Sequence, residues 1–323
     1  MFVSILGTCR WNGLPILPSN QYPLGALPAR FRRERVLIVG CGDVGLRVAR
    51  ALNGRVRLLA LTSSDHRMTL LRSHGITPLA GDLDSPATLA RLAGLATRVV
   101  HLAPPAAEAA GEWWRDLRTA ALFRALRRRQ APASLVYGST SGVYGDCAGE
   151  RVDETQPLRP RTPRAQRRAD AERAVRHYSR GAHVCASILR IPGIYAADRE
   201  GGTPRERLLK GTPVLDAQDD VYTNHIHADD LARAVLAALW RGKPQRTYNA
   251  SDDSELKMGD YFDLAADLYG LPRPARVPRT TAQAELPLML LSFMSESRRM
   301  ENRRLKRELR LVLHYPTVAA GLR

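Results

Sequence analysis

VLIVGCGDVG, residues 36–45, is the stretch that decides the fold of this chain. Its first four residues are apolar and mostly β-branched, which is typical of a strand buried on both faces of a parallel sheet. Gly40, Gly42 and Gly45 follow with the spacing G-x-G-x-x-G, and residues 46–52 continue with helical character. This order predicts a tight turn, an open approach for a diphosphate and close packing of helix on strand. We therefore expect a dinucleotide-binding unit with the phosphates at the helix N-terminus.

Strands and helices alternate from this unit to about residue 191. Strands are expected at residues 56–61, 76–80, 98–102, 134–138 and 183–190, and helices at residues 106–130 and 164–180. Alternation at this spacing predicts an α/β fold, a Rossmann doubly wound parallel sheet with its ligands at the carboxyl ends of the strands.

Beyond Pro192 the alternation stops. Proline-rich loops join helices that are expected at residues 228–241, 258–271 and 296–310. This pattern predicts a smaller C-terminal portion that caps the substrate. The expected parts of the chain are a disordered N-terminal extension (1–32), the Rossmann dinucleotide-binding domain (33–191) and the cap (192–323).

The charge balance is strongly basic, with a formal net charge of +17 from 49 Lys and Arg against 32 Asp and Glu. Only four of these residues are lysines, and the arginines are spread along the whole length. No aromatic-interleaved basic motif accompanies them, so we expect no specific nucleic-acid binding. Attraction to polyanions at low salt is still expected, because it needs only net positive charge.

Several other classes of protein are disfavoured. The chain has no apolar run long enough to span a bilayer, and its scattered cysteines form no C-x-x-C pair. Reduced thiols and a cytoplasmic location without membrane contact are expected. His225 and His227 alternate on an expected strand and lack a third ligand, so no metal site is predicted. Trp113 and Trp114 fit either the core or the face of a homodimer.

Beyond these patterns, the chain resembles extended short-chain dehydrogenase/reductases of the NAD-dependent epimerase/dehydratase family. The resemblance runs from about Arg35 to the C-terminus. It rests on the glycine turn and on the segments GDL (81–83), STSGVYG (139–145), LRIPGIY (189–195) and NHIHADDLA (224–232). The segments MSES (294–297) and YPT (315–317) are similar to an atypical, poorly characterised subgroup of that family.

The resemblance implies a catalytic tetrad for hydride transfer, and this chain departs from it. Thr140 occupies the family's Ser/Thr position, which polarises a substrate oxygen. Counting back from Glu172, the tyrosine of the family's Tyr-x-x-x-Lys element is replaced by Arg164 and the lysine by Arg168. A guanidinium stays protonated at physiological pH, so Arg164 cannot be the proton acceptor. The candidate catalytic residues are therefore Thr140, Arg164 and Arg168, with the arginines as charge-stabilising groups or as a grip on an anionic small-molecule substrate.

Other tyrosines offer no clear substitute for the missing base. Tyr178 lies about fourteen positions beyond Arg164, roughly 20 Å along a helix, and is expected to be a packing residue. Tyr144 and Tyr195 are nearer, but their counterparts in the family are mainly structural or line the pocket.

Cofactor choice is expected at the end of the second strand, where NAD-binding members carry an acid. Here Thr62, Ser63 and Arg67 suit the 2′-phosphate of NADP, whereas Asp65 keeps NAD open. Asp82 and Leu83 resemble the family pair beside the adenine, although a turn acid and a core leucine would explain them equally well. The candidate cofactor-binding residues are Gly40, Gly42, Asp43, Val44, Gly45, Thr62, Ser63, Arg67, Asp82, Leu83 and Ala103.

Two functions remain open from the sequence. The first is an oxidoreductase or epimerase with the altered tetrad. The second is a non-catalytic NADP(H)-binding redox sensor or scaffold, which the missing tyrosine and the intact glycine turn would also suit.

Overall fold

A computed structural model describes residues 34–106 and 112–322 of the chain. The extension predicted for residues 1–32 lies outside the described residues, as does the part of the predicted helix 106–130 that covers residues 107–111.

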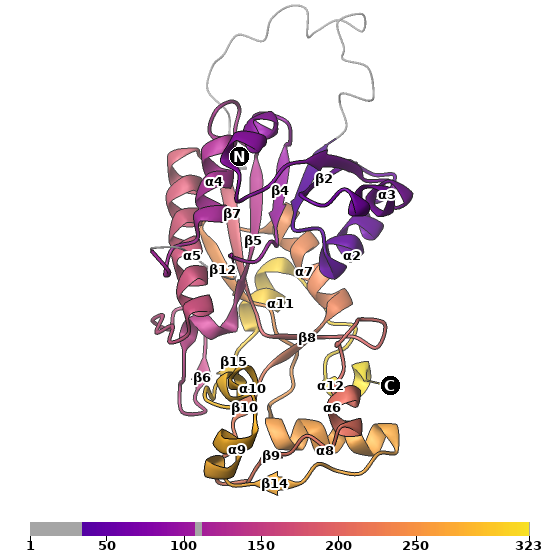
Figure 1. The fold of residues 1–323 in the computed structure, drawn as a ribbon. Coiled ribbons are helices and arrows are strands. Elements are labelled where there is room, and N and C mark those ends of the chain that lie inside the picture. The colour runs from indigo at the N-terminus through magenta and orange to yellow at the C-terminus, as the bar shows by residue number, and fades with distance from the viewer. Residues whose placement is uncertain (1–33, 107–111, 323) are drawn as a thin grey trace, which may run out of the picture. The chain divides into compact units, whose positions relative to one another are not determined.

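Seven of the described strands form one parallel sheet, in the order β3-β2-β1-β4-β5-β7-β12 (Figure 1). The strands that follow β1 in the chain are first added on one side of it, as β2 and β3, and then on its other side, beginning with β4. Such a switch point leaves a crevice at the carboxyl ends of the strands. The predicted Rossmann-type parallel sheet is thereby confirmed. The strands are β1 (Arg35–Val39), β2 (Arg57–Thr62), β3 (Thr77–Ala80), β4 (Arg98–His101), β5 (Ser134–Thr140), β7 (Cys185–Ile191) and β12 (Arg246–Asn249).

Helices cover both faces of the sheet. Alternate side chains of β1 point to opposite faces, and both sets are apolar and must be buried. Val36 and Ile38 belong to one buried cluster, and Leu37 and Val39 belong to another. Both sets are apolar, as the sequence predicted for a strand buried on two sides. The first cluster includes residues of α2 (Asp43–Leu52), α3 (His66–Ser73), α7 (Ala228–Arg241) and α11 (Arg303–Leu309), and the second includes residues of η3 (Pro86–Leu92), α4 (Leu117–Leu126) and α5 (Pro163–Gly181).

A third apolar cluster forms a smaller C-terminal portion below the carboxyl edge of the sheet in Figure 1. Its buried residues come mainly from α8 and from the short elements around it. The helical elements not yet given are η4 (Ser141–Tyr144), α6 (Arg205–Leu209), α8 (Met258–Tyr269), α9 (Arg279–Glu285), α10 (Leu288–Phe293) and α12 (Val318–Gly321). The short strands pair as β8 (Gly193–Tyr195) with β11 (His225–His227), β9 (Val214–Leu215) with β14 (Arg276–Val277), β10 (Tyr222–Thr223) with β13 (Leu256–Lys257), and β6 (Arg151–Val152) with β15 (Arg299–Met300).

The sheet continues past the boundary that was expected at residue 191. β12 pairs in parallel with β7, and α7 packs on the sheet against α2. The sequence analysis missed β12 because its four residues, RTYN, carry too little apolar pattern to indicate a buried strand. The C-terminal third of the chain therefore contributes both to the sheet layer and to the smaller portion.

Two expected helices are shorter than predicted. α4 begins only at Leu117, because the Asp116 side chain accepts a hydrogen bond from the Thr119 amide and caps the helix there. The helix expected over residues 296–310 is confined to residues 303–309, because residues 299–300 pair with β6 as strand β15. Trp113 and Trp114 are 45% and 41% exposed, so the core position considered for them is wrong.

None of the helices in the described ranges combines the length and the apolar character that crossing a membrane requires.

Candidate active site

The glycine turn joins β1 to α2 in a geometry that glycine allows. Gly40 has φ +85°, and a Cβ there would lie 2.3 Å from the Ala103 nitrogen. A Cβ on Gly45 would come within 3.2 Å of the Gly40 oxygen, so helix and strand lie close together. A Cβ on Gly42 would meet no atom within 4 Å, which leaves this side of the turn open. The first amides of α2 have no intrahelical acceptor and face this opening.

A cavity of about 360 Å³ extends from the turn across the ends of β2 and β3. The predicted cofactor residues that line it are Gly40, Gly42, Thr62, Ser63, Arg67, Asp82, Leu83 and Ala103. The Arg67 guanidinium donates to the Cys41 carbonyl oxygen at 2.7 Å, which holds it against the glycine turn. Asp65 is exposed at the start of α3 and is not among the described residues that line this cavity.

The remaining predicted cofactor residues, Asp43, Val44 and Gly45, form the first turn of α2 beside this cavity. The Asp43 carboxylate is paired with Arg47 at 3.1 Å and with Arg199 at 2.7 Å. Asp82 also has the turn role considered for it, since its Oδ1 accepts from the Asp84 amide at 2.9 Å.

Arg118 lines the same cavity and was missed by the sequence analysis. It pairs with Asp84 at 2.5 Å and donates to the Pro104 carbonyl oxygen at 3.2 Å. Nothing in its local sequence indicates this position, because α4 brings it to the cavity from more than 30 residues beyond β3.

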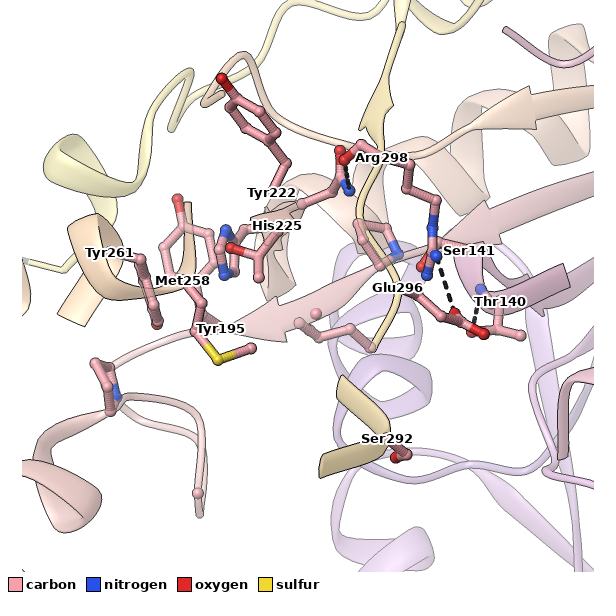
Figure 2. A pocket seen from close by; sticks show the side chains of 18 of the residues that line it. Thr140, Ser141, Tyr195, Tyr222, His225, Met258, Tyr261, Ser292, Glu296 and Arg298 are labelled. Carbon is pink, nitrogen blue, oxygen red and sulfur yellow. Dashed lines mark hydrogen bonds and ion pairs between the residues drawn. The ribbon is translucent and has the colours of Figure 1, made fainter. Parts of the chain in front are cut away.

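A larger cavity of about 870 Å³ lies where the carboxyl edge of the sheet meets the smaller C-terminal portion. It is lined by residues from the end of β5, the start of α5, the loop after β8 and the C-terminal portion. Figure 2 shows Thr140 and Ser141 at one end of it and Tyr261 and Met258 toward the other. The cavity brings together Thr140 and Arg164, two of the three predicted catalytic residues.

Thr140 and Arg164 are both available to a ligand. The Thr140 Oγ1 accepts from the Gly142 amide at 3.3 Å, so its own hydrogen remains free to donate. Arg164 is exposed, and within the described ranges its guanidinium has no hydrogen-bond or carboxylate partner. Partial desolvation of the side chain lowers the pKa of Arg164, and repulsion from the Arg168 charge contributes a smaller part of the shift. An unpaired cation in a cavity wall favours an anionic ligand.

Arg168, the third predicted catalytic residue, is buried and does not line the larger cavity. Its Nη1 donates to the Gly138 carbonyl oxygen at 2.7 Å, to the Tyr137 hydroxyl at 3.2 Å and to the Ala103 carbonyl oxygen at 3.4 Å. It therefore ties the end of β4 to the end of β5, between the two cavities.

The three tyrosines that were considered as substitutes for the missing base are all buried. Tyr144 is fully buried and donates to the Asn249 Oδ1 at 2.6 Å. Tyr195 lines the larger cavity, but its hydroxyl donates to the Thr317 carbonyl oxygen at 3.2 Å, and burial raises its pKa far above the usual value. Tyr178 stacks on Phe123 in the core, as expected for a packing residue. None of the three is set up to accept a proton from a ligand.

Glu296 and Arg298 enter the larger cavity from the segment that was expected to be helical. Their side chains form an ion pair at 2.9 Å and are only 9% and 10% exposed. Figure 2 shows the Glu296 carboxylate directed toward Thr140 and Ser141. The Glu296 Oε1 has no hydrogen-bond partner among the described residues. The segment MSES was noted from the sequence only as a subgroup resemblance, so this carboxylate was missed.

The extended backbone around this pair is held from two sides. The Ser297 carbonyl oxygen accepts from the Cys147 and Gly149 amides at 3.0 Å each. The Asn224 side chain donates to the Arg298 carbonyl oxygen at 2.9 Å and accepts from the Met300 amide at 2.7 Å. These contacts keep both side chains at the cavity wall.

His225 and His227 lie on β11 and do not form a metal site. His227 caps α7 by accepting from the Asp229 amide at 3.2 Å, whereas His225 lines the larger cavity. The described part of the chain contains no group of three or more His, Cys, Asp or Glu side chains arranged to hold a metal ion.

Known proteins resemble both the sequence and the fold. The sequence pattern described as NAD dependent epimerase/dehydratase family matches residues 36–251, which is more than half of the chain. The dTDP-D-glucose 4,6-dehydratase of Bos taurus is 26% identical over 162 residues, and the match covers 47% of this chain and 42% of that protein. The match therefore spans less than half the length of this curated relative.

Two solved structures superpose over most of the chain. A functionally unknown conserved protein from Silicibacter pomeroyi is 30% identical, with a TM-score of 0.74 over 90% of this chain and 96% of that one. UDP-glucose 4-epimerase from Thermotoga maritima, solved with UDP-glucose, is 18% identical, with a TM-score of 0.72 over 89% of this chain and 96% of that one. At that identity, the second likeness concerns the fold.

Proposed function

Because the chain belongs to the NAD-dependent epimerase/dehydratase family, we propose that it is an NADP(H)-linked oxidoreductase or epimerase that acts on a small anionic substrate. One observation carries this proposal: Thr140 and the unpaired Arg164 line one cavity at the carboxyl edge of the sheet. Ligands of open α/β sheets bind at that edge.

The smaller cavity fits the phosphates and the adenosine part of the coenzyme. Its open side at Gly42 leaves room for a diphosphate against the α2 amides. The hydroxyls of Thr62 and Ser63 together with the Arg67 guanidinium provide donors for a 2′-phosphate. Asp65 does not reach this cavity to bind ribose hydroxyls, which supports NADP over NAD. When bound, the coenzyme would supply or accept a hydride.

In this proposal, the substrate oxygen lies between Thr140 and Arg164. Thr140 donates a hydrogen bond to it, and the Arg164 guanidinium stabilises the negative charge that develops there. Arg164 cannot take the proton. Glu296 is the carboxylate directed toward Thr140, and an ionised carboxylate accepts a proton from a hydroxyl group that is being oxidised. In the reverse direction the same carboxyl group returns the proton.

Arg168 acts as a positioning residue. Its three hydrogen bonds hold Ala103 at the coenzyme cavity and Gly138 two residues before Thr140. A single side chain thereby couples the position of the coenzyme wall to that of the reacting group. All three hydrogen bonds are donated by Nη1 of the guanidinium.

The first test is coenzyme binding by the full chain, measured by calorimetry with NADPH and, separately, with NADH, which lacks the 2′-phosphate. We expect NADPH to bind more tightly. Arg67→Gln should remove one charge-assisted contact, worth about 1.5–3 kcal/mol, and weaken NADPH roughly 10- to 100-fold with little effect on NADH. Arg72→Gln, on the exposed side of the same helix, is the matched control. Equal affinity for the two coenzymes would contradict the NADP assignment.

The second test is turnover with either coenzyme on a panel of UDP- and dTDP-sugars and sugar acids, followed by coenzyme absorbance and by chromatography of the products. Thr140→Ala should lower kcat roughly 100-fold through the lost hydrogen bond, whereas Thr140→Ser should retain most of it. Glu296→Gln should lower kcat about 10²- to 10⁴-fold without weakening coenzyme binding. Glu285→Gln, exposed on α9, is the control.

The engagement of Arg168 with main-chain carbonyl oxygens, together with the missing tyrosine, keeps a second candidate function in view, a non-catalytic NADP(H)-binding sensor or scaffold. Tight coenzyme binding without conversion of any compound in the panel would favour it over the enzyme.

A further inference from the structure

A crossed set of ion pairs joins the loop after β8 to the first two turns of α2. Asp198 and Arg199 are neighbours in that loop, and Asp43 and Arg47 lie one helical turn apart on α2. Asp198 pairs with Arg47 at 2.6 Å, and Arg199 pairs with Asp43 at 2.7 Å. Neither Asp198 nor Arg199 has a role in the chemistry proposed above.

The loop presents Arg199 from a closed turn. The Ala196 amide donates to the Gly202 carbonyl oxygen at 3.1 Å, and the Gly202 amide donates to the Arg199 carbonyl oxygen at 2.9 Å. A Cβ on Gly202 would lie 2.5 Å from the Ala196 oxygen, so the turn closes this tightly only with glycine there. Arg199 and Gly202 both line the larger cavity. The turn is therefore part of the wall of the larger cavity and at the same time contacts the helix beside the smaller one.

This position places Arg199 near the middle of a bound coenzyme. Its partner Asp43 is the first residue of α2, the helix whose N-terminal amides follow the glycine turn. A coenzyme with its adenosine part in the smaller cavity and its nicotinamide near Thr140 has its diphosphate at that end of the helix. This step rests on the proposed function, because it takes the two cavities as the sites of coenzyme and substrate.

The diphosphate would bring negative charge to a place that already holds a carboxylate. The Asp43 side chain is 32% exposed in the first turn of α2. Arg47 is buried and is already shared among three carboxylates of the chain. Repulsion between the Asp43 carboxylate and the diphosphate would weaken binding unless a further cation lies close to both. Arg199 is a cation that already touches one of them.

The Arg199 guanidinium has donors to spare for a second anion. Its Nη1 donates to the Asp43 Oδ2, and its other nitrogens make no hydrogen bond within residues 34–106 and 112–322. The side chain is 29% exposed, so these N–H groups are accessible to a ligand. A guanidinium can bind two anions at once because it carries several N–H donors in one plane.

We propose that Arg199 binds the diphosphate of the coenzyme while it keeps its ion pair with Asp43. In the free chain Arg199 offsets the charge of Asp43 alone, and in the complex it offsets part of the diphosphate charge as well. Since the same turn lines the larger cavity, coenzyme binding holds one wall of the substrate site in place. Arg199 differs from Arg67 in its target, because NADPH and NADH share the diphosphate and differ in the 2′-phosphate.

The experiment is calorimetric titration of the full chain with NADPH, with NADH and with adenosine 2′-monophosphate, which lacks the diphosphate. Arg199→Gln should weaken NADPH and NADH alike, about 10- to 100-fold, through the loss of one charge-assisted contact. It should leave adenosine 2′-monophosphate unchanged, which also shows that the variant is folded. Arg205→Gln, an exposed arginine at the start of α6, is the matched control and should leave all three ligands unchanged.

Asp43→Asn separates this role from that of a purely structural ion pair. If the pair served only to hold the loop on α2, breaking it from either side would weaken both coenzymes. Under the proposal, Asp43→Asn removes the repelling carboxylate and leaves Arg199 to the diphosphate. The variant should therefore bind both coenzymes more tightly, by roughly 2- to 10-fold.

Four outcomes would overturn the proposal: unchanged affinity for both coenzymes in Arg199→Gln, weakening of NADPH alone, equal weakening of adenosine 2′-monophosphate, or weaker coenzyme binding in Asp43→Asn. If Arg199→Gln does not fold, the Asp43→Asn titrations decide alone, because that variant leaves the turn intact. Coenzyme binding that does not depend on Arg199 would count against this inference only. No binding of either coenzyme by the unaltered chain would overturn the proposed function together with it.

Discussion

Glu172 is the buried carboxylate that holds the end of β5 in place. It accepts hydrogen bonds from Ser139 at 2.7 Å, from Arg190 at 3.0 and 3.1 Å, and from Arg176 at 3.1 Å. Because Ser139 precedes Thr140, this network sets the position of the proposed reacting group. In the sequence analysis Glu172 served only to locate the positions of the family's tyrosine and lysine. Its contacts give the physical reason for a carboxylate at this position.

Glu172→Gln should therefore destabilise the fold strongly. Burial alone would raise the pKa of Glu172, but the Arg190 and Arg176 charges and the Ser139 hydroxyl outweigh it, and the net pKa is lowered. The variant leaves Arg190 buried without its counter-charge, which costs about 3–5 kcal/mol of unfolding free energy. The measurement is denaturant unfolding at neutral pH, with the exposed Glu206→Gln as control.

The pH dependence of this loss has a definite sign. A carboxylate with a lowered folded pKa contributes stability above its unfolded pKa of about 4.5, and that contribution disappears as the pH falls through the folded pKa. The difference between the unaltered chain and Glu172→Gln should thus shrink below about pH 4.5. A difference that grows on acidification would contradict the assignment.

Asp252 should show the opposite pH dependence. Burial raises the pKa of Asp252 to about 8, and its Oδ2 has no hydrogen-bond partner among the described residues. Between about pH 4 and about pH 8 the folded state holds a proton that the unfolded state has released, so the unfolding free energy falls as the pH rises. Asp252→Asn should remove this decline. Unfolding at about pH 5 and about pH 8 measures it, with the exposed Asp65→Asn as control.

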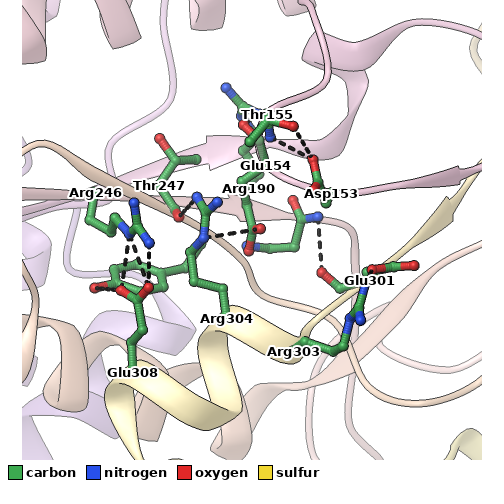
Figure 3. A network of polar contacts seen from close by, with 12 residues as sticks. Asp153, Glu154, Thr155, Arg190, Arg246, Thr247, Glu301, Arg303, Arg304 and Glu308 are labelled. Carbon is green, nitrogen blue, oxygen red and sulfur yellow. Dashed lines mark hydrogen bonds and ion pairs between the residues drawn. The ribbon is translucent and has the colours of Figure 1, made fainter.

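At the scale of elements, the segment over residues 296–300 depends on contacts with distant loops. Residues 299–300 pair with β6, and the Asn224 side chain bonds the segment on its other side. Figure 3 shows the adjoining network, in which residues of this C-terminal region meet Glu154, Thr247 and Arg246. The Arg304 side chain approaches Glu154 to 3.4 Å, and Arg246 is paired with Glu308. The chain after residue 296 is thereby joined to β12 and to the loop after β6.

Asn224→Ala should loosen that segment. The variant removes two hydrogen bonds to its backbone, worth about 1–3 kcal/mol together. Hydrogen exchange of the amides at residues 298–301 should become faster, because the segment would open locally. The matched control is Asn53→Ala at the exposed end of α2. Unchanged exchange at these amides would mean that the pairing with β6 and the contacts of residues 147 and 149 are enough to hold the segment.

At the scale of the whole molecule, the excess of arginine has a structural use within the fold. Arg47 is buried and pairs with Asp43, Asp198 and Asp229, which joins α2 to the loop after β8 and to the start of α7. Arg276 is placed among Asp220, Asp260 and Asp263 in the smaller C-terminal portion. The arginines in these networks are paired with carboxylates of the chain. The net charge alone would suggest that they are available to bind a polyanion.

Binding to nucleic acid should therefore be weak and indifferent to sequence. With a net charge of +17, the chain should bind duplex DNA at about 50 mM salt and lose most of that affinity by about 200 mM, because the attraction comes from counterion release. Fluorescence anisotropy with two unrelated duplexes measures it. A tenfold preference for one duplex that survives at the higher salt would argue for a specific site.

Local spacing was enough to predict the β1–turn–α2 unit, the parallel sheet and eight of the residues that line the smaller cavity. In these places strand period, glycine positions and helix starts act over a few residues, so neighbours in the chain carry the information. The remaining features of the fold and of the site are determined by contacts between residues far apart in the sequence. β12, the extended segment at residues 296–300 and the burial of Arg168 away from the larger cavity all depend on segments far apart in sequence. Their side-chain environments exist only after the sheet and the C-terminal portion have packed, because burial and pairing are properties of the assembled surfaces.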